Sequence, residues 1–248
     1  MRKIGLGILI GIVVLALSGV VAAVPNQTPG EIDKIVFIHY PQGNVPYWSP
    51  AKAPAPAPTD QDTTYKYTGI HWAISSLPVG YRINPSDAPS GAGAAVKSSF
   101  QTWEDEENSS MDFKYLGAAT SVGSNLDYQN VVSWQDITSQ YPGAIAVTVV
   151  WYYRGSKEIA DVDTVMNSGS GFDWSVNTCT DDKCEKPANV SSYDVQNIMT
   201  HEAGHWLMLL DLYQWKTQKL TMYGYGAKGE LQKRTLGLGD ELGIDRIY

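Results

Sequence analysis

Cysteine, histidine and basic residues are scarce in this chain of 248 residues. It has only 2 cysteines and 4 histidines, and its 18 lysines and arginines are outnumbered by 26 aspartates and glutamates, for a net charge of -8. No basic stripe stands out, which argues against a nucleic-acid partner. Hydrophobic residues still make up 43% of the sequence, with 8 tryptophans and 15 tyrosines. That content predicts a packed core and argues against disorder.

The two cysteines, Cys179 and Cys184, are separated by four residues in the polar stretch CTDDKC. Two cysteines without nearby histidines do not complete a zinc site. Outside the cytoplasm such a pair closes a small disulfide loop. We therefore expect a disulfide between them and no role in metal binding.

The first 23 residues have the pattern of a signal peptide. The chain starts with MRK, residues 4–21 carry no charge, and VAA at positions 21–23 offers small residues for cleavage. We expect cleavage after Ala23 and a secreted, extracellular protein that acts as a monomer. The alternative is an uncleaved, outward-facing membrane anchor, because the apolar run is near the length of a spanning helix.

The rest of the chain divides into a leader and one domain. Residues 24–64 look like an N-terminal leader, in which AKAPAPAP at 51–58 is a stiff, extended linker. The compact domain is expected to cover residues 65–248. We find no internal repeats.

Hydrophobic periodicity predicts an α+β fold for this domain. The predicted strands are residues 67–75, 111–116, 144–153 and 158–166. The predicted helices are residues 88–106, a helix capped by Ser191 or Ser192 that runs to about Met208, and a terminal helix at 239–248. The result is a small sheet, followed by one helix that carries the motif described next and one closing helix.

The sequence HEAGH at positions 201–205 is the central motif. Residues four apart share one helix face, so His201 and His205 can both reach one zinc ion. Glu202 lies beside them and can act as the general base toward a zinc-activated water. This is the H-E-x-x-H pattern of zinc proteases, and with only four histidines it arises by chance about a percent of the time or less.

A zinc ion needs a third protein ligand, and the spacing leaves two candidates. Asp211 lies six residues after His205 and can reach the ion only if the helix ends near Met208 and the chain turns back. Glu230 is the rival, placed as in zinc proteases whose third ligand comes from a later segment.

At this point the sequence resembles the metzincins, and among them the matrixin-like proteases. Their motif H-E-x-x-H-x-x-G-x-x-H is followed by a methionine turn; here it reads HEAGHWLMLLD, then LTMYG. The resemblance implies Asp211 as third ligand and Met222 as the methionine beneath the zinc. It also places Met208 at the glycine position, which calls for an uncommon backbone conformation.

Other segments also resemble the matrixins. The stretch VTVVWYYRGSKEIADVDTVMN is similar to the family's edge strand, which pairs with the substrate backbone by strand addition. The ending LGLGDELGI is similar to the segment that leads into the last helix. Tyr223 or Tyr225 could hydrogen-bond the oxyanion, although tyrosines more often serve packing.

The resemblance implies a metzincin-like fold with a small twisted, mostly parallel sheet, and a zinc endopeptidase that acts on proteins or peptides. No spare histidine cluster suggests the structural zinc of animal matrixins, and residues 24–60 lack the cysteine that keeps them latent. Calcium is a further candidate ligand, although an acidic solvated surface is the simpler explanation of the aspartates involved, which are Asp161, Asp163, Asp181 and Asp182. The competing hypotheses are a non-catalytic zinc-bearing module of the same fold and a zincin of another clan that uses Glu230.

Overall fold

The computed structural model describes residues 30–43, 58–176 and 189–248. Within these ranges the chain combines a mostly parallel β-sheet with three α-helices. None of the helices in these ranges is both long and apolar enough to cross a lipid bilayer. At this coarse level the architecture agrees with the predicted α+β class.

A seven-stranded sheet lies at the centre of the described structure, in the order β3-β2-β4-β6-β5-β1-β9. Its strands are β1 (Ile32–Pro41), β2 (Val79–Ile83), β3 (Phe113–Ala118), β4 (Val131–Gln135), β5 (Ala146–Tyr153), β6 (Ile159–Asn167) and β9 (Tyr225–Gly226). Neighbouring strands are parallel, except that β5 runs antiparallel to both β6 and β1. The sheet is thus mostly parallel, as predicted, but larger than the small sheet that we expected.

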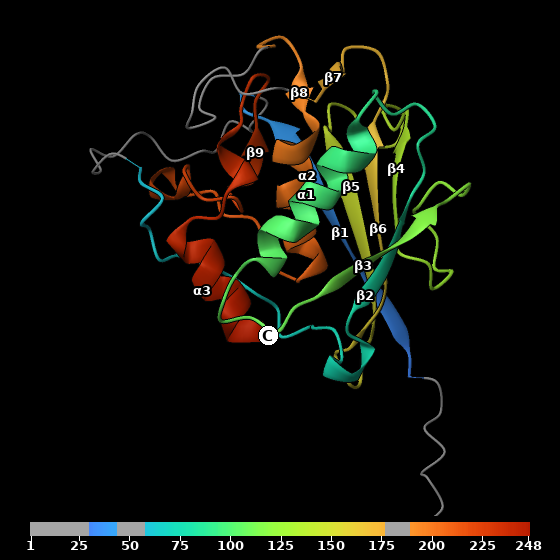
Figure 1. Cartoon of the computed structure of the whole chain (residues 1–248), viewed down its shortest axis with the longest axis vertical. Coiled ribbons are helices and arrows are strands. Elements are labelled where there is room, and N and C mark those ends of the chain that lie inside the picture. Colours follow the sequence, from blue (N-terminus) through green and yellow to red (C-terminus); the bar gives the residue numbers. More distant parts are fainter. Residues whose placement is uncertain (1–29, 44–57, 177–188) are drawn as a thin grey trace, which may run out of the picture.

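The helices and the shorter elements follow the same chain order. They are α1 (Ala92–Glu104), α2 (Val195–Trp206), α3 (Leu238–Ile247), the paired strands β7 (Trp174–Ser175) and β8 (Tyr193–Asp194), and three 3₁₀ turns at Ile74–Ser76, Trp215–Thr217 and Gln232–Arg234. Figure 1 shows α1 and α2 on one side of the large sheet.

Several predicted elements are confirmed within a few residues: the strands at 111–116, 144–153 and 158–166 correspond to β3, β5 and β6, and the three helices to α1, α2 and α3. The strand predicted at 67–75 is wrong. Tyr67 and His71 make only isolated bridges, and Gly69 between them has φ of 83°, which interrupts an extended strand.

The predicted cap of the second helix is also wrong. The N-cap is Asp194, whose carboxylate accepts a hydrogen bond from the Asn197 amide at 2.8 Å. Aspartate is among the best N-cap residues because its side chain satisfies an amide that has no partner within the helix. Ser191 and Ser192 lie before this cap.

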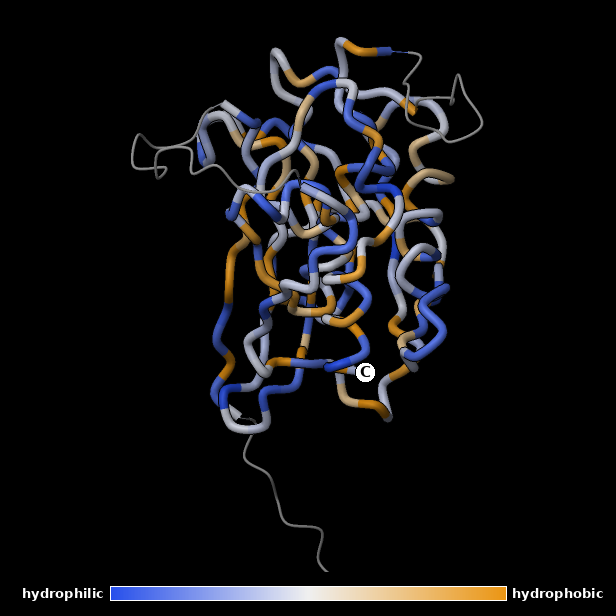
Figure 2. Tube along the Cα trace, turned by 90° about the vertical axis from the view of Figure 1, so that its left-hand side faces the viewer, coloured by the Kyte–Doolittle hydropathy of each residue, from blue (hydrophilic) through white to orange (hydrophobic). Residues whose placement is uncertain are grey.

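The core has two parts because the strands expose alternate side chains to opposite faces. A large apolar cluster lies between the sheet and helices α1 and α2, and it includes Trp103, Val150 and Trp206. A smaller cluster on the other face includes Val149 and Trp151. In Figure 2, hydrophobic and hydrophilic residues accordingly follow one another along the tube instead of forming one long apolar run.

Strand β1 comes from the segment that we expected to be a separate leader. It pairs with β5 from Ile32↔Tyr153 to His39↔Ala146, and Phe37 belongs to the main core cluster. Residues 32–41 are therefore part of the same folded unit as the described residues from 65 onward. The sequence IDKIVFIHYP alternates in the manner of a strand, but its partner lies more than a hundred residues away along the chain.

Candidate metal centre

Helix α2 carries the HEAGH motif into the interior of the protein. The side chains of His201 and Glu202 are fully buried and that of His205 is 1% exposed. The two imidazole centroids are 4.8 Å apart and their planes make an angle of 86°. This is the adjacency that a four-residue spacing on a helix produces.

Backbone carbonyls fix the orientation of both imidazoles. His201 Nδ1 lies 2.8 Å from the Thr221 carbonyl oxygen, and His205 Nδ1 lies 2.8 Å from the Leu209 carbonyl oxygen. A carbonyl can only accept, so each Nδ1 must donate and each neutral ring keeps a lone pair on Nε2. Bonds of this kind orient histidines that bind metals.

The end of α2 turns the chain back toward these histidines. The Leu209 amide donates to the Gly204 carbonyl at 3.0 Å and the Met208 amide to the His205 carbonyl at 2.9 Å, which is the Schellman arrangement. Met208 has φ of 63°, in the left-handed region. The uncommon conformation predicted for this non-glycine residue is thus confirmed, and the helix ends at Trp206, close to the expected place.

The turn brings Asp211 to both histidines. Asp211 Oδ1 lies 3.2 Å from His201 Nε2 and 3.6 Å from His205 Nε2. Ligand atoms of these three residues all lie within 4.8 Å of one another, so the group can hold a metal ion. A second such group consists of His39, His201 and Glu202.

Burial and neighbouring charges both shift the pKa values of the residues at this site. Burial alone would raise the pKa of Asp211, but the His205 and His201 imidazoles hold it well below its usual range. Burial, together with the neighbouring His39, lowers the pKa of His201 to about 4. His201 and Asp211 thus form a neutral imidazole beside an ionised carboxylate, the protonation states that metal ligands require. At His205 burial is outweighed by the charges of Asp211 and Glu202, which raise the pKa.

Both oxygens of the Glu202 carboxylate are engaged. Thr148 Oγ1 donates to Oε2 at 2.6 Å, and His39 Nδ1 lies 2.9 Å from Oε1. Thr148 is in turn 2.7 Å from Thr164 Oγ1 on the neighbouring strand. Burial raises the pKa of Glu202. A carboxylate with a raised pKa is a stronger base, which suits it to take up a proton and release it again.

Met222 lies against the helix between the two histidines. It is 2% exposed and packs on Gly204, where any side chain would overlap its sulfur. The Asp240 carboxylate accepts hydrogen bonds from the Thr221 amide at 2.7 Å and the Met222 amide at 3.0 Å. The start of α3 thereby fixes the turn whose carbonyl orients His201.

The rival ligand Glu230 has other partners. Its Oε2 accepts hydrogen bonds from Asn197 Nδ2 at 3.2 Å and from the Ala227 amide at 3.1 Å, and it lies 3.4 Å from Lys233 Nζ. Glu230 belongs to neither metal-binding group among the described residues.

The two tyrosines considered for the oxyanion lie near the turn. Tyr223 is buried, and its hydroxyl accepts a hydrogen bond from Gln218 at 3.2 Å. Tyr225 lies in β9, with its ring 5.6 Å from that of Tyr223 and 5.1 Å from that of Tyr213. A role in stabilising the oxyanion stays a prediction for both.

Two of the aspartates considered for calcium are buried, so the solvated surface that we expected is wrong for them. Asp161 is 0% exposed and Asp163 1%. Their carboxylates accept hydrogen bonds from three backbone amides of residues 127–131. Burial, with the charge of Asp161 added, raises the pKa of Asp163 to about 8.

Four residues named from the sequence, Cys179, Asp181, Asp182 and Cys184, lie outside the described residues, as do the signal segment and most of the Pro/Ala linker. The expected disulfide therefore stays a prediction.

Sequence reasoning missed four side chains of this site: Phe37, His39, Thr148 and Tyr213. Tyr213 donates a hydrogen bond to Asp211 Oδ2 at 3.1 Å. Tyr213 could have been found from its proximity to Asp211 in the sequence. His39 could have been found because the chain has so few histidines. Nothing in the local sequence marks Phe37 or Thr148, because they reach the site through strand pairing.

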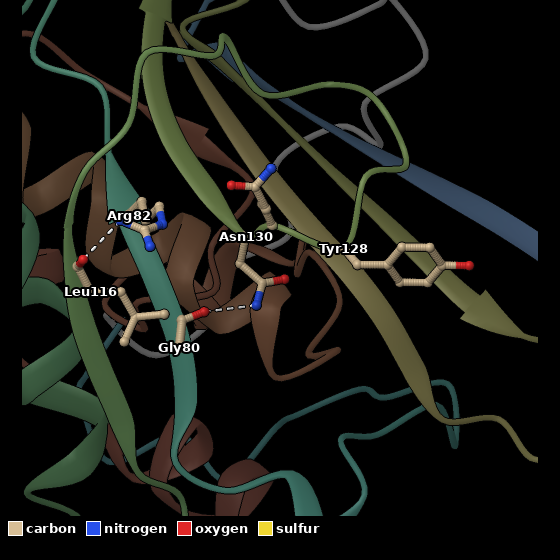
Figure 3. A pocket seen from close by; sticks show the side chains of 6 residues that line it. Gly80, Arg82, Leu116, Tyr128 and Asn130 are labelled. Carbon is tan, nitrogen blue, oxygen red and sulfur yellow. Dashed lines mark hydrogen bonds between the residues drawn. The ribbon is translucent and has the colours of Figure 1, made fainter.

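A hollow elsewhere on the sheet has no comparable chemistry. It is lined by Gly80, Arg82, Leu116, Tyr128, Gln129 and Asn130. Figure 3 shows that Arg82 donates to the Leu116 carbonyl and Asn130 to the Gly80 carbonyl, at 2.8 Å in each case. The side chains of Arg82 and Asn130 are therefore bound to the backbone.

The sequence was also compared with known proteins. No family model matches this chain, and no curated protein matches it.

Proposed function

We propose that this protein is a secreted zinc-dependent endopeptidase of the metzincin type, resembling the matrixins, with His201, His205 and Asp211 as zinc ligands and Glu202 as general base. The observation that carries the proposal is the convergence of the two Nε2 atoms of the HEAGH motif on the carboxylate of Asp211. The proposed substrate is a protein or peptide.

The donor set fits a zinc ion. Two buried atoms, His201 Nε2 and Asp211 Oδ1, make no hydrogen bond within the described part of the chain. Buried polar atoms are rarely left without a partner, and a shared cation would satisfy both. Two imidazole nitrogens and one carboxylate oxygen are usual ligands of catalytic zinc, which keeps a fourth position open.

Zinc, when bound, would supply Lewis acidity that lowers the pKa of a water toward neutrality. The residues of the chain would handle the proton. Glu202 lies next to His201 on α2, and its Oε1 is the oxygen not held by Thr148. Once His39 is displaced, Oε1 can take a proton from the attacking water and return it to the leaving amine.

The substrate backbone would bind by strand addition. Strand β5 corresponds to the matrixin-like stretch for which we expected an exposed edge, but that expectation is wrong for the described chain, because β5 lies between β6 and β1. The edge next to the histidines is therefore covered by the protein's own strand, and a peptide would have to replace it.

The test measures bound zinc and peptide hydrolysis in the full chain, with and without a chelator. We expect about one zinc per chain and hydrolysis that the chelator abolishes. Glu202→Gln should keep the zinc and lower kcat by about 10²- to 10⁴-fold, the usual contribution of a general base. Glu107→Gln, at an exposed turn position after the end of α1, is the matched control.

The outcomes separate the competing hypotheses. Bound zinc with no hydrolysis, in the wild type and in every variant tested, would favour a non-catalytic zinc-bearing module. A chain that binds no zinc would refute the proposal.

A further inference from the structure

Strand β1 covers the edge of β5 beside the metal centre. The two strands run antiparallel from Ile32↔Tyr153 to His39↔Ala146, and the next two residues of β1 pair in parallel with β9. The Gln42 amide continues this ladder by donating to the Gly226 carbonyl at 2.8 Å. A peptide that adds to a sheet edge makes backbone bonds of this kind. The chain thus supplies its own strand between β5 and β9.

The side chains of β1 alternate between two environments. Ile38 packs into the small cluster on the far face of the sheet, whereas Phe37 and His39 point to the metal centre. The Phe37 ring stacks on His205 at 4.0 Å between centroids and 7° between planes, and the His39 ring lies 4.0 Å from that of His201. Both histidines of the motif are therefore covered by one residue of β1 each.

His39 also contacts Glu202, the proposed general base. Its Nδ1 lies 2.9 Å from Glu202 Oε1, and both side chains are fully buried. Thr148 holds Oε2, so both oxygens of Glu202 have a protein partner, and the carboxylate is shielded from solvent. Gly226 permits this close approach, because a Cβ at that position would lie 3.0 Å from His39 Nε2.

From these contacts we infer that β1 is an in-chain inhibitor. It occupies the peptide-binding edge of β5, and His39 keeps the Glu202 carboxylate from water. The inference rests on the proposed peptidase function and adds a means of regulation to it. The described structure is the latent form, and β1 must leave β5 before a peptide can bind. No cysteine is required for this latency.

The test compares peptide hydrolysis and bound zinc in four full-length proteins: the wild type, His39→Ala, His39→Asn and Ile38→Val. We expect His39→Ala to hydrolyse peptide at least about tenfold faster than the wild type, the change that follows the loss of one hydrogen bond to a charged group. His39→Asn should stay close to the wild type, because its amide can still donate to Glu202. Ile38→Val, on the opposite face of β1, should change the rate less than about twofold.

Hydrogen exchange of the β1 amides gives a second readout that does not require activity. The amides of β1 should exchange faster in His39→Ala than in the wild type, while those of β4 and β6 keep their rates. Equal exchange in β1 would overturn the inference, because His39 would then not hold the strand in place.

The two proposals fail in different ways. Zinc-dependent hydrolysis that is as fast in the wild type as in His39→Ala would overturn the inhibitor and leave the peptidase standing. A loss of zinc or activity in His39→Ala would also overturn it, because His39 would then be part of the working site. Absence of zinc and of hydrolysis in all four proteins would overturn both.

Discussion

Gly204 packs directly against the sulfur of Met222, at the point where helix α2 crosses the turn at residues 221–222. A Cβ on Gly204 would overlap this sulfur and come within 2.9 Å of Trp103 Cζ2. Gly204 immediately precedes His205, and the carbonyl of Thr221 orients His201. The contact therefore sets the distance between helix α2 and the turn.

We expect Gly204→Ala to destabilise the protein by about 1–3 kcal/mol, because overpacking a filled interior forces neighbours to move. The matched control is Gly93→Ala in α1, where a Cβ would meet no atom within 4 Å. That change should be neutral or stabilise by up to about 1 kcal/mol, since alanine is the better helix former. Urea unfolding measures both, and a stabilised Gly204→Ala would contradict the packing described.

The choice between the two candidate third ligands can be tested by zinc content. Asp211→Ala should lose most of the bound zinc, because it removes one of the three proposed protein ligands. Glu230→Ala should keep the zinc but lower the unfolding free energy by about 3 kcal/mol, because it leaves the buried Lys233 without its carboxylate partner. Full zinc in Asp211→Ala together with its loss in Glu230→Ala would reverse the assignment.

Met208 combines a left-handed backbone with a fully buried side chain. Met208→Ala should cost about 2–5 kcal/mol through the lost packing. Met208→Gly loses the same packing but relieves the backbone, so it should be about 1 kcal/mol more stable than Met208→Ala. Chemical denaturation of the two variants gives this difference directly. A glycine variant less stable than the alanine variant would argue against strain at this position.

The buried Asp163 makes stability depend on pH. Its pKa in the folded protein is about 8, far above the value of about 3.9 in an unfolded chain. The folded state therefore holds a proton that the unfolded state releases, so its contribution is complete below about pH 4 and is lost as the pH rises through about 8. The unfolding free energy should therefore be a few kcal/mol lower at pH 8 than at pH 5.

Asp163→Asn cannot ionise, yet it keeps the oxygen that accepts from the Val131 amide. We expect this variant to lose much of the decline between pH 5 and pH 8. The measurements are made with a chelator present and repeated with calcium, because a cation bound at Asp161 and Asp163 would favour the ionised forms and reduce the slope. A wild-type slope in Asp163→Asn would show that other groups cause it.

Local sequence determined the parts of the site that depend on helix geometry. The spacing of HEAGH placed His201 and His205 on one face of a helix, since residues four apart are neighbours on any α-helix. The need for a turn after the helix also followed from the sequence, and Met208 in the left-handed region makes that turn. Strands β3, β5 and β6 could be predicted because their own residues favour extended structure.

Only the tertiary structure decided which residues surround this motif. Strand β1 is held by β5, and His39 meets Glu202 across 163 residues of sequence. The strand predicted at 67–75 does not form, because no strand among the described residues pairs with it along its length. A strand is completed by partners distant in the chain, so its place and its contacts with the site emerge only when the sheet is assembled.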